Sequence, residues 1–316
     1  MKILITGAAG YIGGLAVERF LSAGNQILAL DKKEFQNKIQ SPSIQYFQFD
    51  LTKDAWEEKI GKVDVVIHCA FDIKSHYGKI QDQHFNNLEC CKRIWQYCFK
   101  NNVAKLVYLS SAAAYGAKPE NIGKLLKETD SLTENIYPYG SDKREAEEIF
   151  VKTLKENQTA NLKTYFLRLA TVNGEKGKKR SRNLFSFLKG TPILPYADKN
   201  SARQYINEKD VVAAIDFLIN RQDQPIFEIY NLAPSDILTL KDMAKLQKKM
   251  ALRIPKWLVR LAFYLNWHIL RGKIFATAPG SANSFIYPSN MDGSKITKIG
   301  FKYSKNSLET FQEVAK

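Results

Sequence analysis

Tyr139 and Lys143 are two residues whose chemistry and spacing suit proton transfer. They stand four positions apart near the start of a predicted helix, so their side chains share one helix face. A phenol with a pKa near 10 is a poor base at neutral pH, and lowering that pKa to about 7 takes roughly 4 kcal/mol. A neighbouring ammonium in a partly desolvated cleft favours the phenolate. We therefore expect Lys143 to lower the pKa of Tyr139, although an ordinary surface pair has the same spacing.

Ser111 is a third candidate for the same site. It ends a predicted strand and is followed by Ala112, Ala113 and Ala114. Its hydroxyl can hydrogen-bond the substrate oxygen that Tyr139 protonates or deprotonates. The three side chains together predict acid–base chemistry at a hydroxyl or carbonyl group.

A glycine-rich turn at Thr6–Gly13 predicts a second kind of site. It follows the short apolar run Lys2–Ile5, which is typical of a buried strand, and it precedes a helical pattern with Leu15, Val17 and Phe20. Strand, glycine turn and helix in this order form a pyrophosphate site for a dinucleotide, because the backbone and the helix N-terminus approach the phosphates. The candidate cofactor contacts in this turn are Gly7, Ala9, Gly10, Tyr11, Ile12 and Gly13. A turn without a ligand is the alternative.

Asp31 indicates which dinucleotide binds. It ends the predicted strand at 26–30, and it follows Gly13 by a distance typical of the carboxylate that accepts the adenosine ribose hydroxyls. A carboxylate there repels a 2′-phosphate, so NAD is favoured over NADP. Lys32 and Lys33 could attract that phosphate, or they could be solvated charges at a strand end. The Lys143 ammonium is also placed to hold the nicotinamide ribose.

Short apolar runs alternate with helical patterns through the first half of the chain. Further strands are predicted at 44–49, 63–68, 105–109 and 164–169, with a long helix over 81–101. This alternation predicts an α/β protein, a Rossmann-type doubly wound parallel sheet with a smaller C-terminal α/β substrate lobe. Ligands bind beyond the carboxyl ends of such strands. The residues at those ends are Gly7, Asp31, Asp50, Ala70 and Ser111.

The domain prediction follows from where this pattern stops. Residues 1–170 are expected to form the NAD-binding domain, and 203–232 return to it. Residues 171–202 and 233–316 are expected to form the substrate-binding lobe, in which 239–250 is predicted to be a helix.

The composition of the 316 residues is that of an ordinary soluble globular protein. The four cysteines lack Cys-x-x-Cys spacing, so we expect reduced thiols, no metal site and a cytoplasmic protein. The first apolar run is too short for an export signal. The net charge of +15 is spread along the chain without an aromatic-interleaved basic motif, so no nucleic-acid partner is expected. The densest basic run, 176–182, is either a solvated loop or a mouth that attracts a diphosphate.

These motifs resemble those of the extended short-chain dehydrogenases/reductases, the group that holds the NAD-dependent epimerases and dehydratases of nucleotide sugars. The resemblance covers most of the chain and implies that Ser111, Tyr139 and Lys143 are catalytic. It also implies cofactor contacts from Asp50, Leu51, Ala70, Tyr139 and Lys143, and it matches Asn87 to an asparagine of the fourth helix, although Cys90 and Cys91 follow where Gly-Thr is usual.

Three positions depart from the family pattern. Dehydratases of the group carry Asp-Glu after the active-site hydroxyl residue, whereas this chain has Ala112-Ala113, which disfavours dehydration. Thr171 stands where an asparagine usually contacts the substrate diphosphate. We expect Thr171 and Arg203 to bind the substrate, and the altered position weakens the expectation of a nucleotide sugar.

The segment 254–271 combines aromatic and aliphatic residues with Lys256, Arg260, His268 and Arg271. On a helix these four basic residues fall within about 120° of one another. Such a helix can lie in a membrane interface, and the alternative is a lobe helix packed on the core.

The sequence therefore predicts an NAD-dependent epimerase or oxidoreductase that oxidises a sugar hydroxyl, carried on a nucleoside diphosphate. One alternative is a hydroxysteroid-dehydrogenase-like or other lipophilic alcohol/ketone oxidoreductase, which would suit peripheral membrane contact through 254–271. A second alternative is a non-catalytic nucleotide-binding scaffold. A homodimer is also expected.

Overall fold

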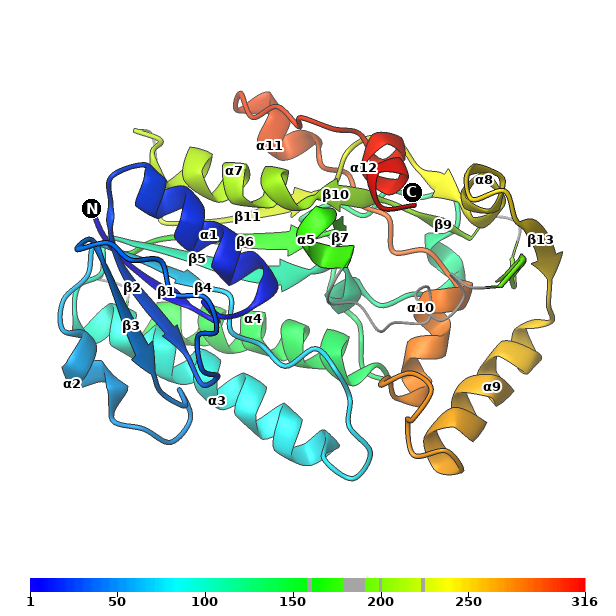
Figure 1. The fold of residues 1–316 in the computed structure, drawn as a ribbon, viewed down its shortest axis with the longest axis horizontal. Helices are drawn as coiled ribbons and strands as arrows, with labels where there is room; N and C mark the ends of the chain where they lie inside the picture. The colour runs from blue at the N-terminus through cyan, green and yellow to red at the C-terminus, as the bar shows by residue number, and fades with distance from the viewer. Residues whose placement is uncertain (158–160, 179–190, 199–200, 223–224, 316) are drawn as a thin grey trace.

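The computed structural model describes residues 1–157, 161–178, 191–198, 201–222 and 225–315. Its centre is one seven-stranded parallel sheet in the order β11-β6-β5-β4-β1-β2-β3 (Figure 1). The strands are β1 (Lys2–Thr6), β2 (Gln26–Asp31), β3 (Ile44–Gln48), β4 (Val65–His68), β5 (Lys105–Ser111), β6 (Lys163–Leu169) and β11 (Phe227–Leu232). The chain winds outward in both directions from β1 and β4, which confirms the predicted Rossmann-type fold.

Both faces of this sheet are buried, which is why its strands are almost continuously apolar. Successive side chains alternate between the faces, so Ile3 and Ile5 pack in one apolar cluster and Leu4 in the other. Two helices cover the first face, α1 (Tyr11–Ser22) and α7 (Glu208–Ile219). Three cover the second, α2 (Trp56–Ile60), α3 (Ile80–Lys100) and α4 (Pro138–Glu156) (Figure 1).

The other elements surround the end of the sheet at which its strands terminate. Three pairs of short strands form there: β7 (Thr171–Asn173) with β10 (Tyr205–Asn207), β8 (Ile193–Tyr196) with β13 (Met250–Arg253), and β9 (Ala202–Arg203) with β12 (Leu238–Thr239). The helices are α5 (Glu175–Lys178), α8 (Leu240–Leu246), α9 (Lys256–His268), α10 (Ala282–Ile286), α11 (Ser294–Lys298) and α12 (Ser307–Ala315), with 3-10 turns η1 (Ala112–Tyr115), η2 (Pro119–Asn121) and η3 (Pro279–Ser281).

Two additional apolar clusters lie among these outer elements, one around Phe263 and Phe285 and one around Tyr205 and Met243. They give the C-terminal part of the chain apolar contacts of its own. The division into an NAD-binding domain and a substrate lobe at the predicted bounds stays a prediction.

The helix predicted over 239–250 is shorter in the structure. Thr239 and Asp242 form a reciprocal capping box that starts α8, but the helix ends at Leu246. Lys248 adopts a left-handed conformation with φ of 55°, and Met250 then begins β13, which pairs with β8. The predicted helix was therefore too long at its C-terminal end. The local pattern stays helical up to Met250, but the pairing of β13 with β8 is a tertiary contact that the local sequence does not encode.

The glycine turn between β1 and α1 is packed too closely for side chains. A β-carbon at Gly13 would lie 2.1 Å from the Gly7 carbonyl oxygen, and one at Gly10 would lie 2.7 Å from it. Gly7 has a positive φ of 66°, and its own β-carbon would lie 2.7 Å from the Ala70 nitrogen at the end of β4. Each glycine thus permits a backbone contact that a larger residue would prevent.

Gly13→Ala should destabilise the protein, whereas Gly14→Ala, one position further along α1, should stabilise it slightly. At Gly14 the added β-carbon would meet only the Ala8 oxygen at 3.5 Å, an ordinary contact, so the gain is the helix propensity of alanine, about 0.5–1 kcal/mol. At Gly13 overpacking should cost about 1–3 kcal/mol. Urea unfolding of both variants measures the difference, and equal stabilities would contradict the packing account.

Candidate active site and cofactor cleft

One cavity lies where β1, β2, β3 and β4 end. Six of the predicted cofactor residues line it, namely Gly7, Gly10, Asp31, Asp50, Leu51 and Ala70. Parallel strands bring these positions together because their carboxyl ends meet at the same edge of the sheet. These six residues stand up to 63 positions apart in the chain (Gly7 to Ala70).

Asp31 is buried at the end of β2 and receives two backbone hydrogen bonds. The Ala9 N–H donates to one carboxylate oxygen at 3.0 Å, and the Lys33 N–H donates to the other at 2.9 Å. The carboxylate thereby couples the glycine turn to the end of β2. Lys32 points to another acid, since its ammonium pairs with Asp72 at 2.9 Å.

Asp50 follows β3, lines the same cavity and is held as a carboxylate. Burial opposes its ionisation, but hydrogen bonds from the hydroxyl and the N–H of Thr52 lower its pKa. The two acids give the cavity a negative side that suits ribose hydroxyls and disfavours an additional phosphate.

The remaining predicted residues of the glycine turn do not line this cavity. Gly10 is the N-cap of α1 and has no side chain to cap the first N–H groups of Tyr11, Ile12 and Gly13. A helix N-terminus of this kind suits phosphate oxygens. The Tyr11 side chain points elsewhere, because its hydroxyl donates to Glu208, and Ile12 packs against the sheet cluster.

Ser111, Tyr139 and Lys143 come together at the end of β5 and the start of α4. The Ser111 hydroxyl oxygen caps η1 by accepting the Ala113 N–H at 3.1 Å, and the Ser111 side chain is close enough to the Tyr139 hydroxyl to act on its pKa. The Lys143 ammonium is buried and donates to the Leu109 carbonyl oxygen at 2.6 Å and to the Tyr108 hydroxyl at 3.2 Å. Its nitrogen lies 6.0 Å from the centre of the Tyr139 ring.

The pKa of Tyr139 differs from the expectation. Burial raises it above the usual value of 10.0, and the hydrogen bond with Ser111 opposes that rise. Lys143 does not lower it, because burial lowers the pKa of Lys143 itself to about 8 and its hydrogen bonds go to β5. The expected lowering of the Tyr139 pKa by Lys143 was therefore wrong.

Phe71 links the cavity to this group and was missed by the sequence analysis. It lines the cavity, its ring lies 3.5 Å from the Lys143 ammonium, and it meets the Tyr139 ring edge-on at 5.8 Å between centroids. Its position directly after Ala70, at a strand end, was the available signal. Phe71 thus forms a wall shared by the two parts of the site.

Glu134 shapes the loop that delivers Tyr139, and it too was missed. One carboxylate oxygen accepts the N–H groups of Asn135, Ile136 and Tyr137 at 3.0, 2.8 and 2.9 Å. No short sequence motif marks this contact. Gly140 packs against this side chain, because a β-carbon there would lie 2.7 Å from the Glu134 Cγ.

Asn87 lies on α3 and faces α4. Its amide donates to the buried Asp142 carboxylate at 2.8 Å and accepts the Asp72 N–H at 2.8 Å. The other Asp142 oxygen is bound to His84 at 2.7 Å. The loop after β4 is therefore tied to the helix that carries Tyr139 and Lys143.

A buried ion pair supports the loop that follows Ser111. Arg168 on β6 and Glu147 on α4 are paired at 2.7 Å, and both side chains are 4% exposed. The Ser110 hydroxyl donates to Glu147, and Arg168 donates to the Tyr115 hydroxyl at 2.8 Å. Breaking a buried pair leaves an uncompensated charge, so the pair itself is held in place. Through its bonds to Ser110 and Tyr115 it also fixes the residues at the two ends of η1.

The two predicted substrate residues lie beyond the sheet. Thr171 begins β7 and is exposed. The half-buried Arg203 guanidinium donates to the carbonyl oxygens of Ala202, Ser284, Phe285 and Tyr287. These bonds tie β9 to α10, a structural role that was not expected, and substrate contact by either residue stays a prediction. Of the basic run 176–182, only Lys176 has a described side chain, which pairs with Glu18, and residues 179–182 lie outside the described ranges.

His68, Cys90 and Cys91 form a buried group that the cysteine spacing did not predict. Their possible ligand atoms lie within 4.8 Å of one another. A metal requires thiolates, however, and a hydrogen bond with Cys91 together with burial raises the pKa of Cys90 well above its usual value. His68 is instead held by Thr6 at 2.7 Å and by Cys91 at 3.4 Å.

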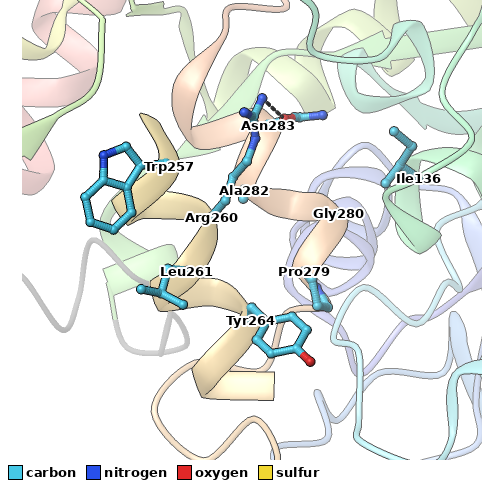
Figure 2. A pocket seen from close by; sticks show the side chains of 9 residues that line it. All are labelled: Ile136, Trp257, Arg260, Leu261, Tyr264, Pro279, Gly280, Ala282 and Asn283. Atoms are coloured by element: carbon cyan, nitrogen blue, oxygen red, sulfur yellow. Dashed lines mark hydrogen bonds between the residues drawn. The ribbon is translucent and has the colours of Figure 1, made fainter. Parts of the chain in front are cut away.

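A second pocket, of about 580 Å³, lies away from the strand ends, between α9 and α10 (Figure 2). Its lining is mostly apolar, and Ile136 closes it on the side opposite α9. Ile136 precedes Tyr139 by three positions, so this pocket adjoins the loop that carries the candidate catalytic tyrosine.

Comparison with known proteins agrees with this geometry. The model of the NAD dependent epimerase/dehydratase family matches residues 3–233. A UDP-glucose 4-epimerase of Caenorhabditis elegans is 28% identical over 294 residues, 79% of this chain and 83% of that protein. A decarboxylating sterol-4-alpha-carboxylate 3-dehydrogenase of Dictyostelium discoideum is 22% identical over 180 residues, 55% of this chain and 54% of that protein.

The fold is shared with a solved structure, the UDP-glucose 4-epimerase of Thermus thermophilus in complex with NAD. The TM-score is 0.70 at 22% identity, over 100% of this chain and 98% of that one. The family match covers the whole central sheet with the strand-end cavity, together with Ser111, Tyr139 and Lys143. This chain is therefore a member of the NAD-dependent epimerase/dehydratase family.

Proposed function

We propose that the protein oxidises a hydroxyl of a nucleoside-diphosphate sugar with NAD and acts as an epimerase or a dehydrogenase. The observation that carries this proposal is the meeting of Ser111, Tyr139 and the buried Lys143 at the end of β5, next to the strand-end cavity. The named UDP-glucose 4-epimerase relatives support a sugar nucleotide as the substrate class.

The residues present fit NAD. The turn of three glycines leaves room for backbone beside the pyrophosphate, and Asp31 offers a carboxylate to the adenosine ribose. Asp50, Leu51 and Ala70 would line the adenine side. When bound, NAD supplies the acceptor for a hydride from the sugar carbon.

Each catalytic side chain has a separate role in the proposal. Tyr139 takes the proton of the sugar hydroxyl and returns it, and Ser111 hydrogen-bonds the same oxygen. Lys143 adds positive charge beneath them and binds the nicotinamide ribose. The raised pKa of Tyr139 favours the protonated phenol, which is the form that returns the proton to the ketone, whereas the removal of the hydroxyl proton needs the phenolate.

The residues after Ser111 disfavour dehydration of the substrate. Ala112 and Ala113 follow Ser111, and the Ala113 N–H serves only to cap η1 through the serine oxygen. One carboxylate oxygen of Glu134 accepts three backbone N–H groups, which fixes this acid to its own loop. No acid/base pair follows Ser111 to expel water.

A lipophilic alcohol or ketone is a second candidate substrate. The apolar pocket beside Ile136 favours it, and the sterol dehydrogenase relative supports it. A thermal-shift screen separates the candidates: NAD and NADP, each alone and with UDP-glucose, UDP-galactose, UDP-N-acetylglucosamine or a sterol. Specific ligands raise the melting temperature by mass action. A shift with the sterol and with no sugar nucleotide would reverse the order of the two candidates.

Tyr139→Phe should lower turnover of the stabilising sugar nucleotide by at least about a hundredfold, because it removes the group that transfers the proton. NAD should still raise the melting temperature. Tyr137→Phe is the matched control, since that ring lies 5.8 Å from Tyr139 and loses the same hydroxyl. Unchanged turnover in Tyr139→Phe would remove Tyr139 from the mechanism, and no turnover in the wild type would favour a nucleotide-binding scaffold.

Asp31→Ser should lower the ratio of NAD affinity to NADP affinity by about tenfold, the equivalent of one hydrogen bond to a charged group. The ratio is the useful measurement because any loosening of the Ala9 contact affects both cofactors. Glu34→Ser removes the same charge from an exposed position and should leave the ratio unchanged. Titration calorimetry provides both affinities, and an unchanged ratio in Asp31→Ser would contradict the assignment.

NAD affinity should weaken by about tenfold as the pH rises through about 8, because the Lys143 ammonium loses its proton there. Below that pH the ammonium is charged and can donate to the ribose. Lys143→Met should bind NAD weakly both below and above that pH. If the NAD affinity of the wild type is the same below and above pH 8, the charge of Lys143 does not contribute to NAD binding.

A further inference from the structure

Helix α9 is apolar on two faces, only one of which is covered. Its inner face packs on the core through Val259, Phe263, Asn266 and Trp267, all buried. The outer face exposes five large side chains, Trp257, Leu258, Leu261, Tyr264 and Leu265. At 100° per residue these five fall within an arc of about 120°. A helix that simply packs on a core has polar residues there instead.

The exposed apolar surface continues into the turn after α9. Ile269, Leu270 and Ile274 are exposed, Ile269 by 67%. The buried Asn266 holds this turn, because its amide donates to the Phe275 oxygen at 2.9 Å and accepts the Ile274 N–H at 3.2 Å. Eight of the 21 exposed large hydrophobic side chains in the described part of the chain therefore lie between 257 and 274.

The same region carries only positive charge. No Asp or Glu occurs from 243 to 291, a stretch that contains eight Lys and Arg residues: Lys245, Lys248, Lys249, Arg253, Lys256, Arg260, Arg271 and Lys273. Lys256 finds its acidic partner outside this stretch, since it pairs with Asp198 at 2.8 Å. Arg260, Arg271 and Lys273 belong to α9 and the turn after it, so the charge beside the apolar surface favours an anionic partner.

We infer that this surface, the outer face of α9 with the turn 269–274, docks the protein on an anionic lipid bilayer. Exposed Trp and Tyr among aliphatic side chains, with Lys and Arg at the border, match the composition of helices that lie in the headgroup region. A second copy of the chain fits less well, because a two-fold contact through this surface would bring like charges together. No helix in the described ranges is long and apolar enough to cross a membrane, so the contact is peripheral.

The pocket between α9 and α10 opens on this surface. Trp257, Leu261 and Tyr264 form its α9 side, and Arg260 reaches across to Asn283 (Figure 2). A guanidinium beside an apolar recess suits a lipid phosphate with part of its acyl chain. Since Ile136 forms the opposite wall, docking places the bilayer next to the loop before Tyr139.

Flotation with vesicles tests this inference on the full-length protein. One set of vesicles contains phosphatidylcholine alone and the other contains phosphatidylglycerol in addition. The wild type should float only with the second set and should be released as salt is raised, since salt screens the attraction. Arg260→Gln/Arg271→Gln should weaken binding by about fivefold per charge, which corresponds to about 1 kcal/mol each. Trp257→Ser/Ile269→Ser should abolish flotation.

Matched controls separate docking from general effects. Lys59→Gln/Lys302→Gln removes the same charge from exposed positions elsewhere, and Ile226→Ser removes an exposed apolar side chain from the sheet edge. Both should float like the wild type, and all variants should keep the wild-type melting temperature. The inference is overturned if the wild type stays unbound, floats equally with phosphatidylcholine alone, or if both α9 variants bind normally. It is also overturned if Trp257→Ser/Ile269→Ser converts a dimer into a monomer, because a second copy then covers this surface.

Discussion

The close approach of Gly7 to its neighbours is the constraint on which the site depends. The Gly7 carbonyl oxygen lies too close to Gly10 and Gly13 for either residue to carry a β-carbon. Gly7 itself packs against the backbone of Ala70, just after β4. This contact brings the start of α1 against two strand ends. The Asp31 carboxylate then fixes the turn from the third strand end through the Ala9 N–H. A change in any of these positions moves the backbone that faces the cofactor.

The catalytic half of the site is held by buried charge. Lys143, Arg168 and Glu147 are almost fully enclosed, and each is bound to groups that fix its direction. Such groups are expensive to bury unless every partner is in place. The resulting rigidity explains why Ser111 and Tyr139 meet although they come from a strand end and a helix start. Phe71 completes the arrangement, since it touches both the cavity and the ammonium.

The protein thus combines a cofactor site common to its family with a C-terminal region of its own character. The sheet, the strand-end cavity and the tyrosine–lysine pair lie within the family match, whereas α9 and its pocket lie beyond residue 233. The exposed apolar face of α9 would be unfavourable in water without a partner. Docking on a bilayer is compatible with a sugar nucleotide and with a lipophilic substrate, so it does not decide between these two substrate classes.

Much of this architecture was readable in the sequence, because its signals are local. Glycine spacing, strand–helix alternation and the Tyr-x-x-x-Lys spacing each reflect contacts within a few residues, and they predicted the parallel sheet and the residues at its edge. Tertiary structure decided the rest. The bonds of Lys143 to Tyr108 and Leu109, the carbonyl cage around Arg203 and the strand pairing of Met250 all join residues that are distant in the chain. The pKa of Tyr139 is likewise set by burial, which no spacing encodes. For α9 the sequence determined a helix with apolar and basic residues, but only packing decided which face is left in solvent.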